Sequence, residues 1–175
     1  MSKVQEIYRG KVVRLCLEQV ELPNGRRADL EIVHHPGGAA AVALDADGRV
    51  CLLRQFRHAA GGWIWELPAG KLEANEPPQA TALRELEEEA GQRAARCQSL
   101  GRLLSSPGVF DEVIHLYLAR ELTEVALNHE PHESIEVHWL PLAQALSMAR
   151  NGEILDAKTI VGLFRAQALL AASTT

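Results

Sequence analysis

The sequence predicts an α+β fold in which a mixed β-sheet is flanked by helices. Three observations support this prediction. Apolar and polar residues alternate over residues 4–35, two short apolar runs flank a turn at residues 45–48, and the apolar spacing becomes helical over residues 77–90. A chain of 175 residues can bury the core of one domain, and no repeat or linker-like stretch divides it.

The N-terminal region is predicted to be an antiparallel β-hairpin. Its two alternating runs are separated by a Pro-Asn-Gly turn at residues 23–25. A second pair of strands is expected around the Asp-Ala-Asp-Gly turn at residues 45–48, and both flanking apolar runs suit central strands. Trp63 and Trp65 would lie on one face of a further strand, which leads into Pro68-Ala69-Gly70 and a loop that begins with Gly70.

The clearest helix is predicted over residues 77–90. Prolines stand where it would begin, Gly91 stands where it would end, and the expected apolar stripe consists of Ala80, Leu83, Leu86 and Ala90. Further strands are expected near residues 96–104, 112–119 and 134–140. Two more helices are expected near residues 142–150 and 156–171.

Composition and charge exclude several classes of protein. Eighteen Lys and Arg against 23 Asp and Glu give a net charge of −5, so there is no general basic surface for non-specific nucleic-acid binding, and a phosphate ligand would need a local site with a cation. No apolar run reaches the roughly 18 residues of a membrane span, so the expected location is cytoplasmic. The three cysteines have no metal-site or disulfide spacing and are expected to be reduced, mostly buried thiols.

The predicted helix carries a pattern of carboxylates that suits metal binding. Glu85, Glu88 and Glu89 stand at positions i, i+3 and i+4, which places them on one face. Like charges at this spacing destabilise a helix unless a cation neutralises them. Oxygen ligands without a neighbouring His or Cys favour Mg²⁺ or Mn²⁺ over zinc. The alternative is an ordinary solvated acidic face.

The spacing around these residues resembles the Nudix box, Gly-x5-Glu-x7-Arg-Glu-U-x-Glu-Glu-x-Gly-U, in which U is apolar. The matching residues are Gly70, Glu76, Arg84, Glu85, Leu86, Glu88, Glu89 and Gly91, whereas Gln92 departs from the pattern at the last apolar position. The resemblance implies a single Nudix hydrolase domain over residues 1–175, with a mixed sheet sandwiched between helices. It also implies a divalent-metal site that hydrolyses a nucleoside diphosphate linked to another group.

The resemblance assigns roles within the box. It implies metal binding by Glu85, Glu88 and Glu89, with the backbone carbonyl near Ala69 as a further ligand. Glu76 and Arg84 would brace the loop against the helix.

Segments outside the box are similar to the ADP-ribose pyrophosphatase branch of the family. These segments are residues 66–73, the Ser-Pro-Gly of residues 106–108, and residues 156–159. In that branch Pro107 would mark a loop at the terminal sugar of the substrate, and Glu112 would hydrogen-bond its ribose. Taken alone, Ser-Pro-Gly is equally compatible with an ordinary turn.

The same resemblance suggests further substrate contacts. Arg57 matches an arginine that contacts phosphate, and a guanidinium suits a diphosphate. Trp63 and Trp65 are candidates to stack on adenine, with core packing as the alternative reading, and Trp139 is read as core. His34 and His35 are read as surface residues without ligand-like companions.

The general base is expected on the acidic loop at residues 130–133. Glu133 is the first choice, Glu130 is in reserve and Glu89 is a further catalytic candidate, while Pro131 occupies a position where the branch often has another acid. His132 is read as a solvated loop residue.

The expected activity is Mg²⁺-dependent hydrolysis of ADP-ribose or a related nucleoside diphosphate sugar to AMP and a sugar phosphate, with Mn²⁺ as a substitute ion. The alternatives are GDP-mannose or another nucleotide sugar as substrate, and a Nudix module that senses a nucleotide without hydrolysing it. The resemblance to this branch also implies that residues 1–36, an N-terminal β-region, take part in a homodimer.

Overall fold

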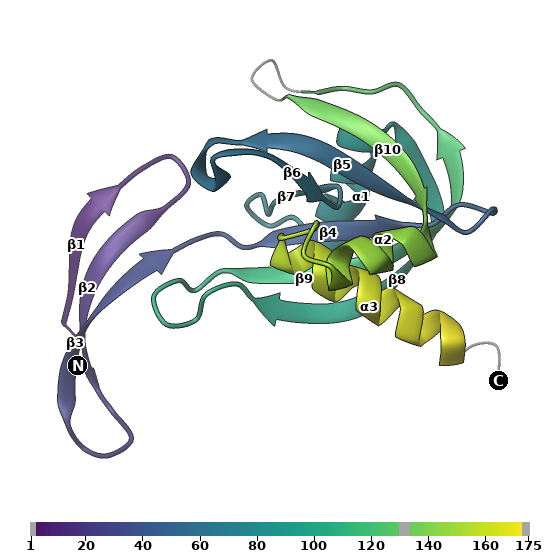
Figure 1. Ribbon diagram of the computed structural model, residues 1–175. Coiled ribbons are helices and arrows are strands. Elements are labelled where there is room, and N and C mark those ends of the chain that lie inside the picture. Colours follow the sequence, from purple (N-terminus) through teal and green to yellow (C-terminus); the bar gives the residue numbers. More distant parts are fainter. Residues whose placement is uncertain (1–2, 130–133, 173–175) are drawn as a thin grey trace. The chain divides into compact units, whose positions relative to one another are not determined.

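The computed structural model describes residues 3–129 and 134–172 (Figure 1). The strands are β1 (Lys3–Arg9), β2 (Arg14–Glu21), β3 (Arg27–His34), β4 (Gly38–Ala43), β5 (Arg49–Arg57), β6 (Gly62–Glu66), β7 (Ala69–Lys71), β8 (Gln92–Leu104), β9 (Val113–Glu124) and β10 (Ile135–Pro141). The helices are the short 3₁₀ turn η1 (His58–Ala60), α1 (Pro78–Ala90), α2 (Leu142–Arg150) and α3 (Ala157–Ala172).

The chain forms two compact units. The first unit comprises Met1–Gly37 and Leu104–Val113, and the second comprises Gly38–Leu103 and Ile114–Thr175. Each unit is described below by itself.

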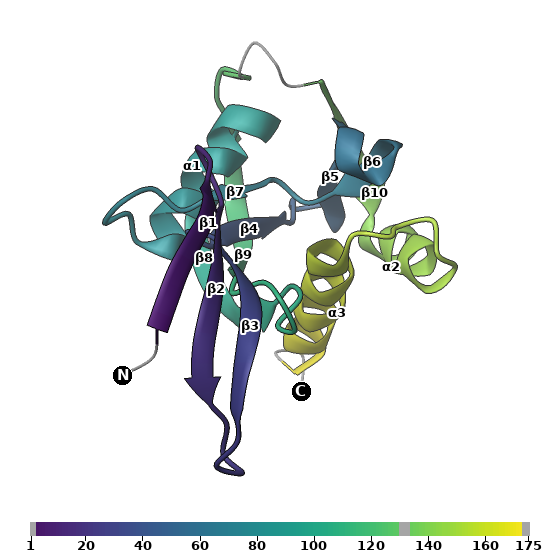
Figure 2. The ribbon, with the colours of Figure 1, turned by 90° about the vertical axis from the view of Figure 1, so that its left-hand side faces the viewer.

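The first unit is built on an antiparallel sheet in the order β1-β2-β3 (Figure 2). The predicted hairpin is confirmed as β2 and β3, whose turn contains Gly25 at a φ of 78°, a conformation that glycine adopts at little cost. The prediction did not include β1, which adds a third strand. Segment 104–113 is hydrogen-bonded to β3. The Val33 N–H donates to the Val109 carbonyl (2.8 Å), and the Val33 carbonyl accepts from the Asp111 N–H (3.1 Å).

The second unit contains two sheets. One is antiparallel in the order β10-β5-β6. The other, β7-β4-β9-β8, is mixed, because β4 runs parallel to β9 and antiparallel to β7. The prediction of a mixed sheet with helices is therefore confirmed, and both apolar runs form central strands.

The expected pairing of those two runs is wrong. β4 and β5 belong to different sheets and share a single bridge between Leu44 and Val50 beside their turn. Strands that are apolar on both faces fit the interior of either sheet, so the hydrophobic pattern cannot select their partners.

The second unit is a sandwich in which β4 has helices on both faces. Ala40 and Val42 belong to a buried cluster with Leu163 of α3. The alternate residues Ala39 and Ala41 belong to a second cluster, which contains Ala82 and Leu86 of α1. Figures 1 and 2 show α1 on one side of β4, and α2 and α3 on the other. Successive residues of a strand point to opposite faces, so one strand serves both clusters.

The buried face of α1 differs from the predicted stripe. Its buried residues are Thr81, Ala82, Leu86, Glu89 and Ala90, whereas Ala80 is exposed and Leu83 is half-buried. The buried face of the helix therefore includes a carboxylate, that of Glu89. A stripe chosen from apolar residues alone could not include it. Gly91 ends the helix as predicted, at a φ of 62°.

Other boundaries differ modestly from the predictions. β8 begins at Gln92 and β9 continues to Glu124, while the short strand β7 (Ala69–Lys71) occupies the start of the expected loop. Cys16 and Cys51 are buried, Cys97 is half-buried, and all three are free thiols as expected. Among the described helices, none combines the length and apolar character required to cross a membrane.

Candidate metal centre and active site

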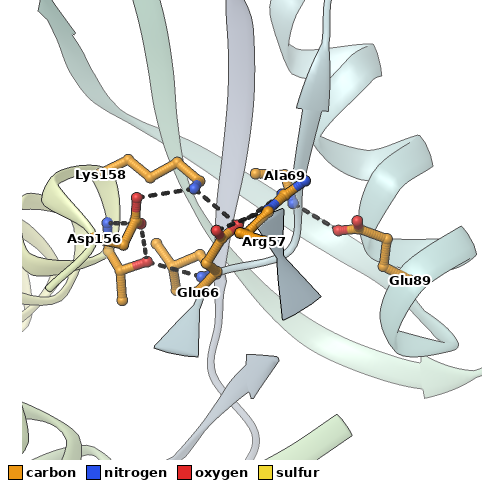
Figure 3. Close-up of polar contacts among 8 residues, drawn as sticks. Arg57, Glu66, Ala69, Glu89, Asp156 and Lys158 are labelled. Atoms are coloured by element: carbon orange, nitrogen blue, oxygen red, sulfur yellow. Dashed lines mark hydrogen bonds and ion pairs between the residues drawn. The ribbon is translucent and has the colours of Figure 1, made fainter. Parts of the chain in front are cut away.

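The connection between β6 and β7 forms hydrogen bonds with α3, β4 and α1. The Leu67 N–H donates to the Thr159 hydroxyl (2.9 Å), and the Pro68 carbonyl accepts from a backbone N–H of β4 (3.0 Å). The Ala69 N–H donates to Glu89 Oε2 (2.8 Å), as Figure 3 shows. Because Glu89 is only 3% exposed, this bond supplies a donor that a buried carboxylate requires. The connection is therefore fixed directly to the acidic face of α1.

Gly70 allows a second glutamate to approach the same connection. A Cβ at this position would overlap the Glu85 carboxylate. Glycine at position 70 thus lets the Glu85 side chain lie against the backbone of β7. The first position of the motif therefore requires glycine, because a larger side chain would overlap Glu85, the first glutamate of the helix.

Arg84 joins the loop to the remaining carboxylates. Its Nε and Nη2 donate to the two oxygens of Glu76 (3.0 and 3.1 Å), so the brace expected between loop and helix is present. Its Nη1 donates to Glu85 (2.8 Å) and Glu88 (2.9 Å). The hydrogen bonds from Arg84, with a further one from Thr81, lower the pKa of Glu76 to about 2. The carboxylates around it raise the pKa of Arg84.

The three α1 glutamates share a face, but the head group of Glu89 has a different partner from those of Glu85 and Glu88. Glu85 and Glu88 bind Arg84, whereas Glu89 binds the Ala69 amide. Within residues 3–129 and 134–172, their oxygens do not form a group that lies within 4.8 Å. The crowding expected from helical spacing is relieved by a guanidinium and an N–H donor, because adjacent like charges repel. Their all-oxygen donor set still fits a hard divalent cation.

A second polar network lies at the end of β6 (Figure 3). Arg57 donates two hydrogen bonds to Glu66 (3.0 and 2.8 Å), and Lys158 bridges Glu66 and Asp156, at 3.1 Å from each. Burial raises the pKa of the Glu66 carboxyl, but hydrogen bonds and charge from Arg57 and Lys158 outweigh it and hold that pKa below its usual value. Glu66 therefore stays ionised while its side chain is only 4% exposed.

The two networks leave an excess of negative charge. Arg84 forms ion pairs with three carboxylates, those of Glu76, Glu85 and Glu88. Arg57 and Lys158 form ion pairs with two, those of Glu66 and Asp156. Glu89 adds a sixth carboxylate against the three cations, so these nine residues carry three net negative charges when all are ionised. A site of this charge attracts divalent cations and repels a bare diphosphate.

An exposed aromatic pair lies on β5 and β6. Trp63 is 44% exposed and meets Phe56, itself 47% exposed, edge to face at 6.1 Å between ring centroids. Trp65 is half-buried and packs against the core, with the Arg54 guanidinium 5.1 Å from its ring centroid. Of the two predicted stacking residues, Trp63 offers the more accessible ring surface.

Two predicted substrate residues fall in the first unit. Pro107 is exposed in segment 104–113. Glu112 is partly buried and lies 3.2 Å from His35 Nδ1. His34 also lies between carboxylates, those of Glu18 (2.8 Å) and Asp111 (2.5 Å). The interpretation of both histidines as surface residues without ligand-like companions is therefore wrong, because those companions come from distant parts of the chain.

The predicted general bases lie outside the described residues. This applies to Glu130 and Glu133 and to their neighbours Pro131 and His132. His129, the last described residue before them, has its Nε2 2.8 Å from the Glu89 carbonyl. The segment that leads to the acidic loop therefore contacts the end of α1.

Sequence reasoning missed Glu66, Lys158 and Asp156 of the second polar network and Phe56 of the aromatic pair. Lys158 and Asp156 belong to a segment that was noted only for its similarity to one branch, and nothing in their spacing indicated the buried Glu66 as their partner. Phe56 is separated from Trp63 by a turn. A predicted β5–β6 hairpin register could have paired these two aromatic residues across the strands.

Comparisons with known proteins find a matching family model and several similar proteins. The family model described as the NUDIX domain matches residues 34–161. An ADP-ribose pyrophosphatase of Bacillus subtilis (strain 168) is 43% identical over 157 residues, covering 89% of this chain and 85% of that protein. A methanol dehydrogenase activator of Bacillus methanolicus is 40% identical over 163 residues, covering 92% and 88%.

More distant matches follow. A GDP-mannose pyrophosphatase of Citrobacter koseri (strain ATCC BAA-895 / CDC 4225-83 / SGSC4696) is 35% identical over 141 residues, covering 75% of this chain and 73% of that protein. A crystal structure of an ADP compounds hydrolase superposes with a TM-score of 0.84, at 21% identity, over 98% of this chain and 93% of that one. The fold, the braced box and the length of these matches lead to one conclusion: the chain belongs to the Nudix hydrolase family, whose members generally depend on divalent metal ions.

Proposed function

We propose that the protein hydrolyses the pyrophosphate bond of ADP-ribose, or of a related nucleoside diphosphate sugar, to AMP and a sugar phosphate. For ADP-ribose the second product is ribose 5-phosphate. The observation that carries the proposal is the acidic face of α1, which Gly70, Ala69 and Arg84 hold against the β6–β7 connection. The name of the Bacillus subtilis relative supports the choice of substrate.

The proposed metal ligands are Glu85, Glu88, Glu89 and the Ala69 carbonyl. We assign them Mg²⁺, with Mn²⁺ as a substitute, because carboxylate and carbonyl oxygens are the ligands that these hard ions prefer. The bound ion supplies neutralisation of the diphosphate charge and a water of lowered pKa. Glu76 and Arg84 position the ligands, since Arg84 contacts both Glu85 and Glu88.

The proposed diphosphate contact is Arg57. Its Nε and Nη2 bind Glu66, which fixes the plane of the guanidinium, while Nη1 has no hydrogen-bond partner among the described residues. The side chain is 41% exposed, so this edge can meet a phosphate oxygen. Glu66 therefore acts by orienting Arg57.

The proposed adenine contact is Trp63, with its neighbour Phe56, because both rings are exposed. Trp65 is the weaker candidate, because Arg54 lies over its ring. Pro107 and Glu112 remain the proposed contacts of the terminal ribose. For the general base we keep Glu133, with Glu130 in reserve. Glu89 stays a further catalytic candidate through its role as a metal ligand.

Hydrolysis of a panel of nucleotide sugars in ¹⁸O-labelled water tests the proposal. The panel contains ADP-ribose, ADP-glucose, GDP-mannose and UDP-glucose, each assayed with Mg²⁺, with Mn²⁺ and with chelator. We expect ADP-ribose to give the highest kcat/KM, with AMP and ribose 5-phosphate as products, and one ¹⁸O atom in one product. No metal-dependent release of AMP from ADP-ribose would overturn the proposal.

GDP-mannose is the second candidate substrate. Guanine stacks on an exposed aromatic ring as adenine does, and one relative is named a GDP-mannose pyrophosphatase. A kcat/KM for GDP-mannose above that for ADP-ribose would favour it. Tight binding of uncleaved ADP-ribose without turnover would instead favour a sensing module. That outcome is the less expected one, because the box glutamates are all present.

We also propose that the N-terminal region forms a homodimer and that the protein acts in the cytoplasm. Every residue of β1 is exposed, including the apolar Val4, Ile7 and Tyr8 at 50%, 54% and 60%. Exposed apolar side chains on an unpaired strand edge are suited to contact a second copy. Light scattering after gel filtration should give about twice the monomer mass of 19.2 kDa, and a monomer at micromolar concentration would contradict the dimer.

A further inference from the structure

Three kinds of metal-binding atom converge in the first unit. The Cys16 sulfur, a Glu18 carboxylate oxygen and a ring nitrogen of His34 all lie within 4.8 Å of one another. Cys16 and Glu18 are two apart on β2, and His34 stands near the end of the neighbouring strand β3, opposite Arg14. Two-residue spacing on one strand and the cross-strand register therefore bring these side chains to one face. We call these three residues the Cys16 cluster.

The cluster is enclosed but reachable. Cys16 is fully buried, and among the described residues no hydrogen bond to its thiol is formed. The side chains of Glu18 and His34 are 22% and 25% exposed. A thiol without a partner, beside an imidazole and a carboxylate that both reach solvent, resembles a coordination site that is open on one side.

A fourth residue, Asp111, contacts the ring nitrogen of His34 that does not face Glu18. His34 presents Nε2 to Glu18 and Nδ1 to Asp111, whose other oxygen accepts from the His35 N–H (2.8 Å). A carboxylate that accepts from one ring nitrogen fixes the tautomer in which the other nitrogen can bind a metal.

The donor set decides which ion is suitable. Thiolate, imidazole and carboxylate together favour Zn²⁺ over Mg²⁺, because sulfur and nitrogen are softer ligands than oxygen. With metal–ligand distances of about 2.0–2.3 Å, ligand atoms of a tetrahedral site lie roughly 3.3–3.8 Å apart. The three ligand atoms of the cluster lie within 4.8 Å of one another, so small side-chain movements would bring them to these distances.

A further carboxylate and two arginines lie next to the Cys16 cluster. Glu6 stands opposite Cys16 on β1, but its carboxylate is bound by Arg9 at 3.1 and 2.6 Å. Arg14 lies 4.0 Å from the same carboxylate. The Glu6 carboxylate is thus paired with arginines, and Glu18 is the carboxylate that faces Nε2 of His34.

We propose that Cys16, Glu18 and His34 bind one Zn²⁺ ion, with Asp111 orienting His34 and a water molecule as the fourth ligand. The site is separate in residues and donor chemistry from the α1 glutamates. It would join β2 and β3 and, through Asp111, segment 104–113. Because an ion that binds only the folded state stabilises it, Zn²⁺ should raise the melting temperature.

Metal titration of the chelator-treated full chain tests this proposal. Excess Mg²⁺ is kept present throughout, so that the α1 carboxylates are supplied with a hard ion. We expect one equivalent of Zn²⁺ to bind, and one equivalent of Co²⁺ to give a thiolate-to-cobalt charge-transfer band in the near ultraviolet. Cys16→Ser and His34→Gln should each lower Zn²⁺ affinity about 100-fold or more, and Asp111→Asn about 10- to 100-fold.

Matched controls separate the site from general thiol binding. Cys97→Ser removes a half-buried thiol outside the cluster and should leave affinity and spectrum unchanged. A wild-type Co²⁺ spectrum without the thiolate band would overturn the proposal, and this readout needs no variant to fold. Equal Zn²⁺ affinity of wild type and a folded His34→Gln protein would overturn it as well. The histidine would then be an ordinary hydrogen-bond bridge between Glu18 and Asp111.

Discussion

The α1 glutamates and the Cys16 cluster are two candidate metal sites of opposite design. The first draws its side chains from one helix and offers only oxygen, whereas the second draws them from two strands and offers sulfur, nitrogen and oxygen. In the structure the carboxylates of α1 bind Arg84 and Ala69. The ligand atoms of the Cys16 cluster, in contrast, already lie within 4.8 Å of one another. Regular spacing along a helix therefore predicts which residues share a face, but not where their head groups point.

The difference also concerns what supports each site. Arg84 and Gly70, both close in sequence to the glutamates, hold the first site. Asp111, 77 residues from His34, supports the second. A site supported by local sequence leaves a motif, whereas a site supported by a remote loop does not.

The largest effect is expected from Glu88→Gln and Glu89→Gln. Each exchange removes a negative charge at constant size, so kcat should fall by about 100-fold or more, with the fold intact by circular dichroism. The matched control is Glu87→Gln on the same helix, since Glu87 binds Arg93 (both bonds 2.8 Å) and not Arg84. Wild-type turnover in Glu88→Gln and Glu89→Gln would refute the assignment of metal ligands to α1.

A smaller loss is expected from Gly70→Ala. The new methyl group would overlap the Glu85 carboxylate and displace it, which should lower kcat/KM about 10- to 100-fold. Gly62→Ala is the control, because a Cβ there meets nothing within 4 Å. If both alanine variants were equally active, the approach of Glu85 to β7 would have no catalytic role.

The brace should appear in the pH dependence of stability. Glu76 has a pKa of about 2 in the folded protein against 4.5 as the reference value, so its ionised form stabilises the fold fully above pH 4.5. That contribution is lost as the pH falls from 4.5 to about 2. The stability difference between wild type and Glu76→Gln, measured by urea unfolding with chelator, should shrink over this interval.

Because Glu76 is partly exposed, the difference should be no more than about 1 kcal/mol. A constant difference from pH 6 to pH 2 would mean that Glu76 acts through its shape and not through its charge.

The smallest effect is expected when the two sites are tested against each other. They share no ligand, so Cys16→Ser should change kcat/KM with Mg²⁺ by less than about twofold, and Glu88→Gln should leave Zn²⁺ affinity equally unchanged. Loss of Mg²⁺-dependent turnover in a folded Cys16→Ser protein would show that the two sites are coupled.

The sequence by itself determined the features that depend on neighbours along the chain. The 3.6-residue period placed α1 and the common face of Glu85, Glu88 and Glu89, and alternation placed the N-terminal strands. Both depend on backbone geometry over a few residues, and the family motif added the Glu76–Arg84 brace.

Only the tertiary structure decided which distant segments meet. It separated β4 from β5 into two sheets, buried Glu89, and gave Glu66 its partner Lys158. It also placed His34 between Glu18 and Asp111. Strand register and loop packing are set by the burial of the whole core, so contacts between residues far apart in the chain leave no local pattern in the sequence.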